Sequence, residues 1–327
     1  MRKFLFVLLV LFMACSDEDV LDTVNSPLNY YTSGELMYND NISEWFDRSL
    51  DVYGIRLLAA GAVGGQLAVP DEWVKKTAQT FKMLLNKNQP EINPIAQEQV
   101  IKNLLGETGW HMGYPTGQRI AYGGGNEYSP NPLTDEGRLL YDGLCTLQDN
   151  MALDDMVWYK NIDSQFTGDD DIVEILEHTL HTLHRFGVRG AVDGSMAALN
   201  MEADEEDISE TALFMAMKEA YDNGVFGIDG YGGDITNQDR WPVMLKEYQY
   251  LLTFGMWEFG TAFWENESLS PEWHDNARTP EGISEHNPLG YNLFNTYYKP
   301  VISKPSIENL RLIFQDNDQG VSGYQAD

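Results

Sequence analysis

The chain has 327 residues, of which 21 are Lys or Arg and 51 are Asp or Glu, so its formal net charge is −30. A surface this acidic repels phosphate groups, which excludes nucleic acid and disfavours anionic membrane surfaces as partners. Hydrophobic residues make up 43% of the chain and aromatic residues 12%, too many for a protein that is mainly a disordered acidic chain. We therefore expect a folded protein whose partners are neutral molecules, cationic molecules or metal ions.

The N-terminus has the pattern of an export signal. A short basic segment, residues 1–3, precedes an apolar run over residues 4–14 that is too short to span a bilayer. Cys15 follows, and the segment resembles the signal of a bacterial lipoprotein, in which the cysteine is lipidated and becomes the mature N-terminus. The acidic residues 16–19 resemble the export signal of surface lipoproteins in Bacteroidota. The alternative is an ordinary signal peptide that is cleaved.

This resemblance implies a signal peptide over residues 1–14 and a lipid anchor on Cys15. The partner of the anchor would be the outer membrane, with the protein on the cell surface or on the periplasmic side. Residues 15–40 are polar and predict a flexible acidic tether between the lipid and the folded domain.

The remaining elements follow in chain order. The sequence predicts a helix over 41–52, a strand over 53–65, and helices over 71–85 and 94–105. Short strands are expected at 118–122 and 156–162, and the segment 139–147 between them is compatible with a helix or a strand. Further helices are predicted at 170–186, 209–223, 241–259 and 306–314.

Strands that come first and helices that follow predict an α+β fold. Because no linker divides residues 45–315, we expect one helix-rich domain over 41–315 with a small mixed sheet. Residues 316–327 are acidic and polar and predict a flexible tail.

The helix predicted over 170–186 carries three of the six histidines, His178, His181 and His184, beside Glu174 and Glu177. At about 100° per residue these five side chains share one face, opposite a stripe of Ile and Leu residues. Residues three or four apart on a helix are neighbours, so two such side chains can bind one ion. The pattern predicts a divalent metal site, with zinc as the expected metal. A solvated polar face and a proton-transfer or pH-sensing site are the alternatives.

The string Glu177-His178-Thr179-Leu180-His181 has the frame of the zincin signature His-Glu-x-x-His with its first two residues exchanged. In that frame Glu177 and His181 are metal ligands and His178 takes the position of the general base. His184 is a further candidate ligand, and Glu174 lies four residues before His178.

A ligand from elsewhere in the chain is also needed. Zincins often take it from a glutamate on a later helix, and Glu247 lies inside the helix predicted over 241–259. Tyr248 and Tyr250 are near it and could donate a hydrogen bond to a developing oxyanion.

Three features together resemble an uncharacterised group of secreted, often marine bacterial proteins, and more distantly the zincin metallopeptidases of the lethal-factor type. They are the strand at Val52-Tyr53-Gly54-Ile55, the helix with a carboxylate and a histidine four apart, and Glu247-Tyr248-Gln249-Tyr250. The resemblance spans about residues 50–260 and implies a zincin-like fold.

The candidate metal ligands are Glu177, His181, His184 and Glu247. If the site is catalytic, we expect metal-assisted hydrolysis of peptides, with His178, Glu174 and Tyr248 as catalytic groups. The strand segment 156–159, if it lies at a sheet edge, would pair with the extended peptide.

A second hypothesis is a non-catalytic surface lipoprotein that binds glycans or peptides. Trp241, Trp257, Trp264 and Trp273 lie in the last third of the chain, where aromatic rings could form a platform for sugars. The alternative is that Trp257 and Trp264 are core residues. Metal content distinguishes the two functions.

Overall fold

The structure is a computed structural model that describes residues 29–38, 43–62, 67–122, 150–159, 168–202, 208–263, 272–315 and 320–327. The predicted signal peptide, Cys15, the segment 139–147 and Trp264 lie outside these ranges. No helix within them is long and apolar enough to cross a membrane.

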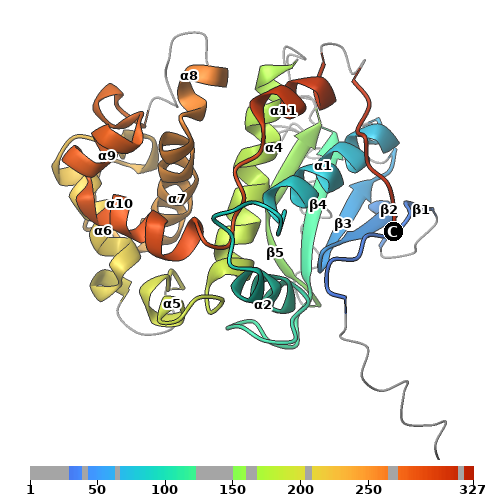
Figure 1. Ribbon diagram of the computed structural model, residues 1–327, viewed down its shortest axis with the longest axis horizontal. Coiled ribbons are helices and arrows are strands. Elements are labelled where there is room, and N and C mark those ends of the chain that lie inside the picture. Colours follow the sequence, from blue (N-terminus) through green and yellow to red (C-terminus); the bar gives the residue numbers. More distant parts are fainter. Residues whose placement is uncertain are drawn as a thin grey trace, which may run out of the picture.

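Within these ranges, five strands form one mixed sheet in the order β1-β2-β3-β4-β5 (Figure 1). They span Met37–Tyr38, Phe46–Val52, Ile55–Ala60, Thr116–Tyr122 and Ala152–Tyr159. The pairs β1·β2 and β2·β3 are antiparallel, whereas β3·β4 and β4·β5 are parallel. Within the described part of the chain, β5 is therefore one edge of the sheet.

The segment 41–52, predicted as a helix, contains strand β2, so that prediction is wrong. Along β2 the exposed Asp51 stands between the buried Leu50 and Val52, as the alternation of a strand requires. Tyr53 and Gly54 have φ angles of 45° and 84° and form a two-residue turn into β3. Two positive φ angles match the twist of a hairpin, which favours local strand pairing over a helix.

Most helices follow the sheet in sequence, which confirms the prediction of a helix-rich α+β fold. The α-helices of the described residues are α1 (Asp71–Leu84), α2 (Pro94–Leu104), α4 (Asp169–Thr182), α5 (Ser195–Ala198), α6 (Ala212–Asp222), α7 (Trp241–Trp257), α8 (Phe259–Phe263), α9 (Pro280–His286), α10 (Pro288–Leu293) and α11 (Ile307–Ile313), of which only α1 and α2 precede β4. A π-helical segment, Leu183–Val188, continues α4, and a second one, Phe294–Tyr298, continues α10.

The local sequence explains several helix starts. Asn93 caps α2, because its side chain accepts the backbone N–H groups of Ile95 and Ala96, at 3.1 and 3.2 Å. α9 and α10 were not predicted from the sequence, since a proline in the interior of a helix kinks or ends it. Pro280 and Pro288 instead occupy the first turns of these helices, where a proline lacks no needed hydrogen bond.

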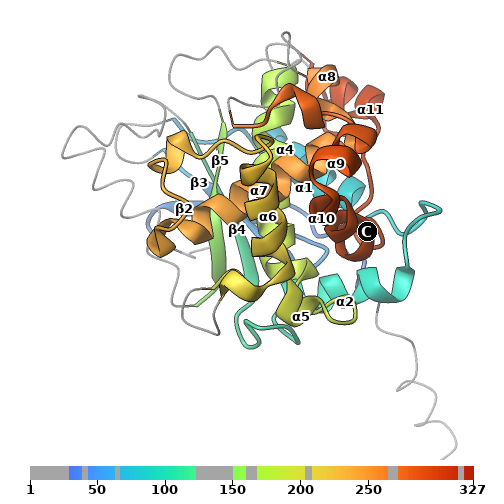
Figure 2. The same ribbon diagram turned by 90° about the vertical axis from the view of Figure 1, so that its left-hand side faces the viewer.

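α4 is the central helix of the fold. It packs against β5 and α1 on one side and against α7 on the other, and Figures 1 and 2 show α6, α7, α9 and α10 gathered on its side away from the sheet. Ile172, Ile175 and Leu176, on its apolar stripe, are fully buried. One hydrophobic cluster extends from Phe46 to Phe314, so the sheet and the C-terminal helices share a core.

The folded part extends beyond the predicted bounds 41–315 at both ends. Ser33 forms a β-bridge with Val52, and the backbone N–H of Asp327 donates to the Ser33 carbonyl at 2.9 Å. The Tyr324 hydroxyl donates to the Gly34 carbonyl at 2.6 Å. Residues 29–38 and 320–327, which we expected to be tether and tail, therefore lie together beside the sheet.

Candidate metal centre

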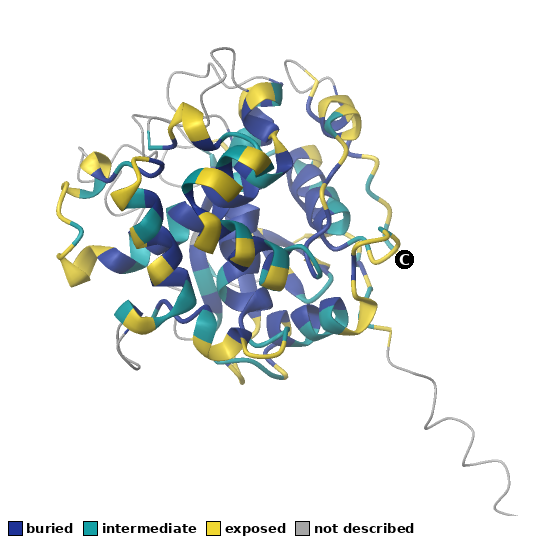
Figure 3. Cartoon of the chain, turned by 60° about the vertical axis from the view of Figure 1, so that its left-hand side comes forward, coloured by how far each residue is buried: buried dark blue, intermediate teal, exposed yellow. Residues whose placement is uncertain are grey.

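The polar stripe of α4 is buried. His178, His181 and His184 are 8%, 1% and 2% exposed, and α7 covers His181 and His184, which lie against Glu247 and Thr253. Figure 3 shows buried residues in the interior of the molecule and exposed residues on its outer helices and loops. The alternative of a solvated histidine face is therefore wrong, and the polar groups of the stripe must find partners inside the protein.

Three side chains of α4 form a cluster that could hold a metal ion. Glu177, His178 and His181 each offer one ligand atom, and these atoms lie within 4.8 Å of one another. Ligand atoms of one tetrahedral zinc ion are about 3.3 Å apart, given bond lengths near 2 Å, so small side-chain rotations would close this trio on an ion. No other such group occurs in the residues that the structure describes.

The trio differs from the predicted roles at two positions. His178 was expected at the position of a general base, whereas the structure groups it with the candidate ligands Glu177 and His181. His184, an expected ligand, lies outside the trio. Its Nε2 is 3.2 Å from Thr253 Oγ1, and its ring centroid is 4.5 Å from that of Tyr298.

Glu247 reaches the trio from α7. Its Oε2 is 3.6 Å from His181 Nε2, close to the spacing of two ligand atoms on one zinc ion. Its Oε1 is 3.6 Å from Lys246 Nζ, which also lies 3.9 Å from Asp154 Oδ1. Two helices that are distant in sequence thus place a histidine and a glutamate side by side, as the sequence predicts.

Tyr250, and not Tyr248, is the tyrosine next to the trio. The ring centroids of Tyr250 and His181 are 5.1 Å apart in an edge-on contact. Tyr248 is fully buried, and its hydroxyl donates to Asn287 Oδ1 at 2.7 Å. Residues three apart on a helix share a face and adjacent residues do not, so Tyr250 lies beside Glu247 while Tyr248 points elsewhere. The predicted oxyanion role of Tyr248 is therefore wrong.

The cluster brings carboxylates together at positions that water reaches little. The pKa of Glu177 is raised to about 7, mainly by burial and also by the nearby carboxylates Glu247 and Glu174, against the opposing effect of His178 and His181. A divalent cation would replace the proton that such a carboxyl group holds near neutral pH. Two imidazoles with carboxylates are a donor set that suits zinc and other divalent transition metals.

Two further histidines are buried away from the trio. Burial lowers the pKa of His184 to about 3, with a smaller contribution from His181. The pKa of His111 is likewise lowered to about 4, mainly by burial and to a smaller extent by the guanidinium groups of Arg185 and Arg189. Both imidazoles are therefore neutral at pH 7 and act as structural groups.

The edge strand β5 is tied to the histidine helix. The backbone N–H of Trp158 donates to Glu174 Oε1 at 2.8 Å. This N–H is used within the chain, so it is not presented to an added strand. The predicted pairing of a peptide with residues 156–159 therefore lacks one of the hydrogen bonds it requires.

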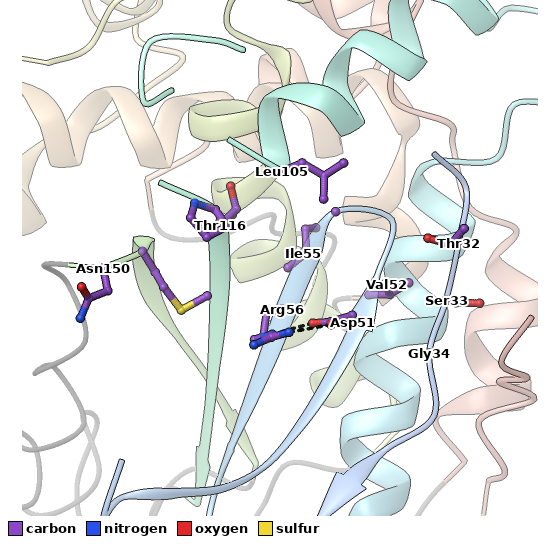
Figure 4. A pocket seen from close by; sticks show the side chains of 13 residues that line it. Thr32, Ser33, Gly34, Asp51, Val52, Ile55, Arg56, Leu105, Thr116 and Asn150 are labelled. Carbon is purple, nitrogen blue, oxygen red and sulfur yellow. Dashed lines mark hydrogen bonds and ion pairs between the residues drawn. The ribbon is translucent and has the colours of Figure 1, made fainter. Parts of the chain in front are cut away.

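A cavity of about 650 Å³ lies apart from the trio (Figure 4). It is bounded by the β2–β3 turn, the end of α2 and the first residues of β4 and β5. Its two charged side chains, Arg56 and Asp51, pair with each other, with Nε 2.7 Å from Oδ1. None of the side chains of the trio, and neither Glu174 nor Glu247, contributes to its lining.

The tryptophans of the last third are core residues where the structure describes them. Trp241, Trp257 and Trp273 are 7%, 4% and 1% exposed. These three rings are therefore not available as a surface platform for sugars.

We found no match between the chain and a protein family model, a curated protein or a solved structure. The zincin-like resemblance stays a prediction, and function is inferred from the residues of the site.

Proposed function

We propose that the protein binds one divalent metal ion, zinc, between α4 and α7. The observation that carries this proposal is the trio of the half-buried Glu177 and the buried His178 and His181. Glu247 faces it from α7, with Oε2 3.6 Å from His181 Nε2. Buried carboxylates that repel one another cost free energy unless a cation or a proton neutralises them. A zinc ion would neutralise this group and hold the two helices together.

Hydrolysis of peptides is the second candidate function, and the exposure of Glu177 favours it. Four protein ligands close a zinc site, whereas three leave a position open for water. Glu177 is the half-buried member of the trio, while the two histidines are buried. If Glu177 stays off the ion, then His178, His181 and Glu247 hold it and Glu177 is the carboxylate beside it. Bound zinc would supply polarisation of a carbonyl and activation of water.

The metal content of the purified protein tests the first proposal. After zinc loading and removal of free metal, we expect one zinc per chain in the wild type and none in a His181→Ala variant. His184→Gln is the matched control, because His184 lies on the same stripe but contacts Thr253. A wild-type protein that retains no stoichiometric metal would contradict the proposal.

A peptide digest tests the second proposal. Zinc-loaded protein is incubated with a mixture of synthetic peptides, and the products are identified by mass spectrometry. We expect cleavage that a chelator abolishes and that the His181→Ala variant lacks. Cleavage at equal rates in that variant would come from another source and would contradict a hydrolytic metal site.

We also propose that Cys15 carries a lipid that anchors the protein to the outer membrane. The basic segment, the apolar run and the cysteine support this. A Cys15→Ser variant is expected to leave the membrane fraction and to lose incorporation of a labelled fatty acid. Equal membrane association of the variant would contradict the anchor.

A further inference from the structure

Glu174 lies one turn before the trio and makes two contacts with one oxygen. Its Oε1 is 3.0 Å from His178 Nε2 and also accepts the backbone N–H of Trp158 at 2.8 Å. The side chain is 13% exposed, so water competes little for these contacts. Glu174 is not a member of the group of candidate ligands around Glu177 and His181.

The contact with His178 determines which ring nitrogen is available to a metal. A histidine that binds a metal ion through one nitrogen commonly donates the N–H of the other to a carboxylate, which fixes the tautomer and the orientation of the ring. With Nε2 donating to Glu174, Nδ1 is the nitrogen of His178 that carries the lone pair. The carboxylate also makes the imidazole a stronger base and therefore a stronger ligand.

The contact with Trp158 fixes the carboxylate in turn. Trp158 belongs to strand β5, so the position of its backbone N–H is fixed by the strand. A backbone donor cannot rotate away as a side chain can, so Glu174 has a defined position relative to the sheet. The chain of contacts therefore runs from β5 through Glu174 to His178.

We propose that Glu174 is the positioning residue of the metal centre and that it prepares His178 to bind the ion through Nδ1. This inference rests on the proposed metal function. It assigns Glu174 a role outside the coordination sphere, in place of the catalytic role predicted from the sequence.

A purely structural role makes a different prediction. Glutamate and histidine four residues apart on a helix stabilise the helix on their own. In that case, substitution of Glu174 would lower stability and leave metal affinity and ligand geometry unchanged. Metal affinity and the spectrum of a bound ion therefore separate the two roles.

The experiment compares Glu174→Ala, Glu174→Gln and the wild type in the full chain. Zinc affinity is measured by competition with a chromophoric chelator, and the absorption spectrum of bound Co²⁺ reports ligand geometry. We expect one metal per chain in all three proteins, with affinity about 10- to 100-fold weaker in Glu174→Ala. Glu174→Gln, which keeps an acceptor oxygen, should lie between the other two, and the Co²⁺ spectrum should shift in Glu174→Ala.

The matched control is Glu202→Gln. Glu202 also pairs with a residue next to α4, since its Oε1 is 2.9 Å from Arg185 Nε, but it is not part of the cluster. This variant should keep the zinc affinity and the Co²⁺ spectrum of the wild type. If Glu174→Ala loses its fold, Glu174→Gln supplies the comparison.

Wild-type affinity and an unchanged spectrum in folded Glu174 variants would overturn the positioning role and leave the metal centre intact. A wild type that binds neither zinc nor Co²⁺ would overturn both. The two proposals therefore fail in different ways.

Discussion

His181 and His184 lie about one turn apart on the same buried stripe and differ in what α7 presents to them. Both are almost fully buried, at 1% and 2% exposed. His181 meets the carboxylate of Glu247, whereas His184 meets the hydroxyl of Thr253 and the ring of Tyr298. A carboxylate beside an imidazole makes a cation site, and a hydroxyl makes a neutral hydrogen bond. The partner helix, and not the histidine pattern itself, decides which position could bind a cation.

The largest effect should separate these two histidines. His181→Ala removes a ligand from the ion, so we expect zinc affinity to fall at least about 100-fold. His184→Gln should leave zinc affinity within about threefold of the wild type. Competition with a chelator measures both. Equal losses in the two variants would show that the difference in their partners has no functional meaning.

The carboxylate partner should have the next largest effect. Glu247→Gln keeps the shape of the side chain and removes its charge, so we expect a loss of zinc affinity of about 10- to 100-fold. Glu258→Gln is the control, because Glu258 caps the C-terminal end of the same helix and is exposed. Zinc titration followed by calorimetry gives both values. An unchanged affinity in Glu247→Gln would exclude Glu247 as a ligand.

The neutral histidine should give a pH effect in the metal-free protein. The pKa of His184 is lowered from 6.5 to about 3, so the unfolded chain takes up the proton first as the pH falls. The stability that this group contributes is present above pH 6.5 and is lost below it. Between pH 6.5 and pH 5 the loss is about 2 kcal/mol.

His111 has a lowered pKa and acts in the same direction, whereas the raised pKa of Glu177 acts in the opposite one. The comparison is therefore between the wild type and His184→Gln, each unfolded in urea at several pH values. The free energy of unfolding of the wild type should fall more steeply between pH 6.5 and 5. Parallel curves would contradict a neutral buried His184.

The smallest effect concerns the ring beside His184. The Tyr298 hydroxyl donates to Gln249 Oε1 at 2.8 Å in the core. Tyr298→Phe should lower the free energy of unfolding by about 1 kcal/mol, because a buried acceptor loses its donor. Zinc affinity should not change, as chelator competition would show. A change in zinc affinity would mean that the surroundings of His184 are coupled to the candidate metal centre around His181.

The amphipathic pattern of the sequence predicts helix α4 and its polar stripe, but not the burial of that stripe. A helical wheel describes the helix alone, and the burial of His181 and His184 arises from packing against α7. The pairing of His181 with Glu247 could be predicted because zincin-like sites commonly take a ligand from a later helix. The spacing of Glu247 and Tyr250 could also have shown that Tyr250, and not the predicted Tyr248, shares the face of Glu247.

Two other features could not be predicted from the sequence, each for a physical reason. The hairpin at Tyr53 and Gly54 depends on two positive φ angles, and a tyrosine rarely signals one. The role of Glu174 depends on a backbone N–H of β5, and the sequence pattern of a helix carries no information about a neighbouring strand.

The contact of His181 with Glu247 also has a consequence for the entropy of the unfolded chain. An ion held by both side chains would close a loop between residues 181 and 247, which includes α5 and α6. By analogy with covalent cross-links, closing a loop of this length removes chain entropy equivalent to about 4 kcal/mol. Metal ions would then act on the folding of this protein as a removable cross-link, and their supply would determine how firmly the C-terminal helices stay attached to the sheet.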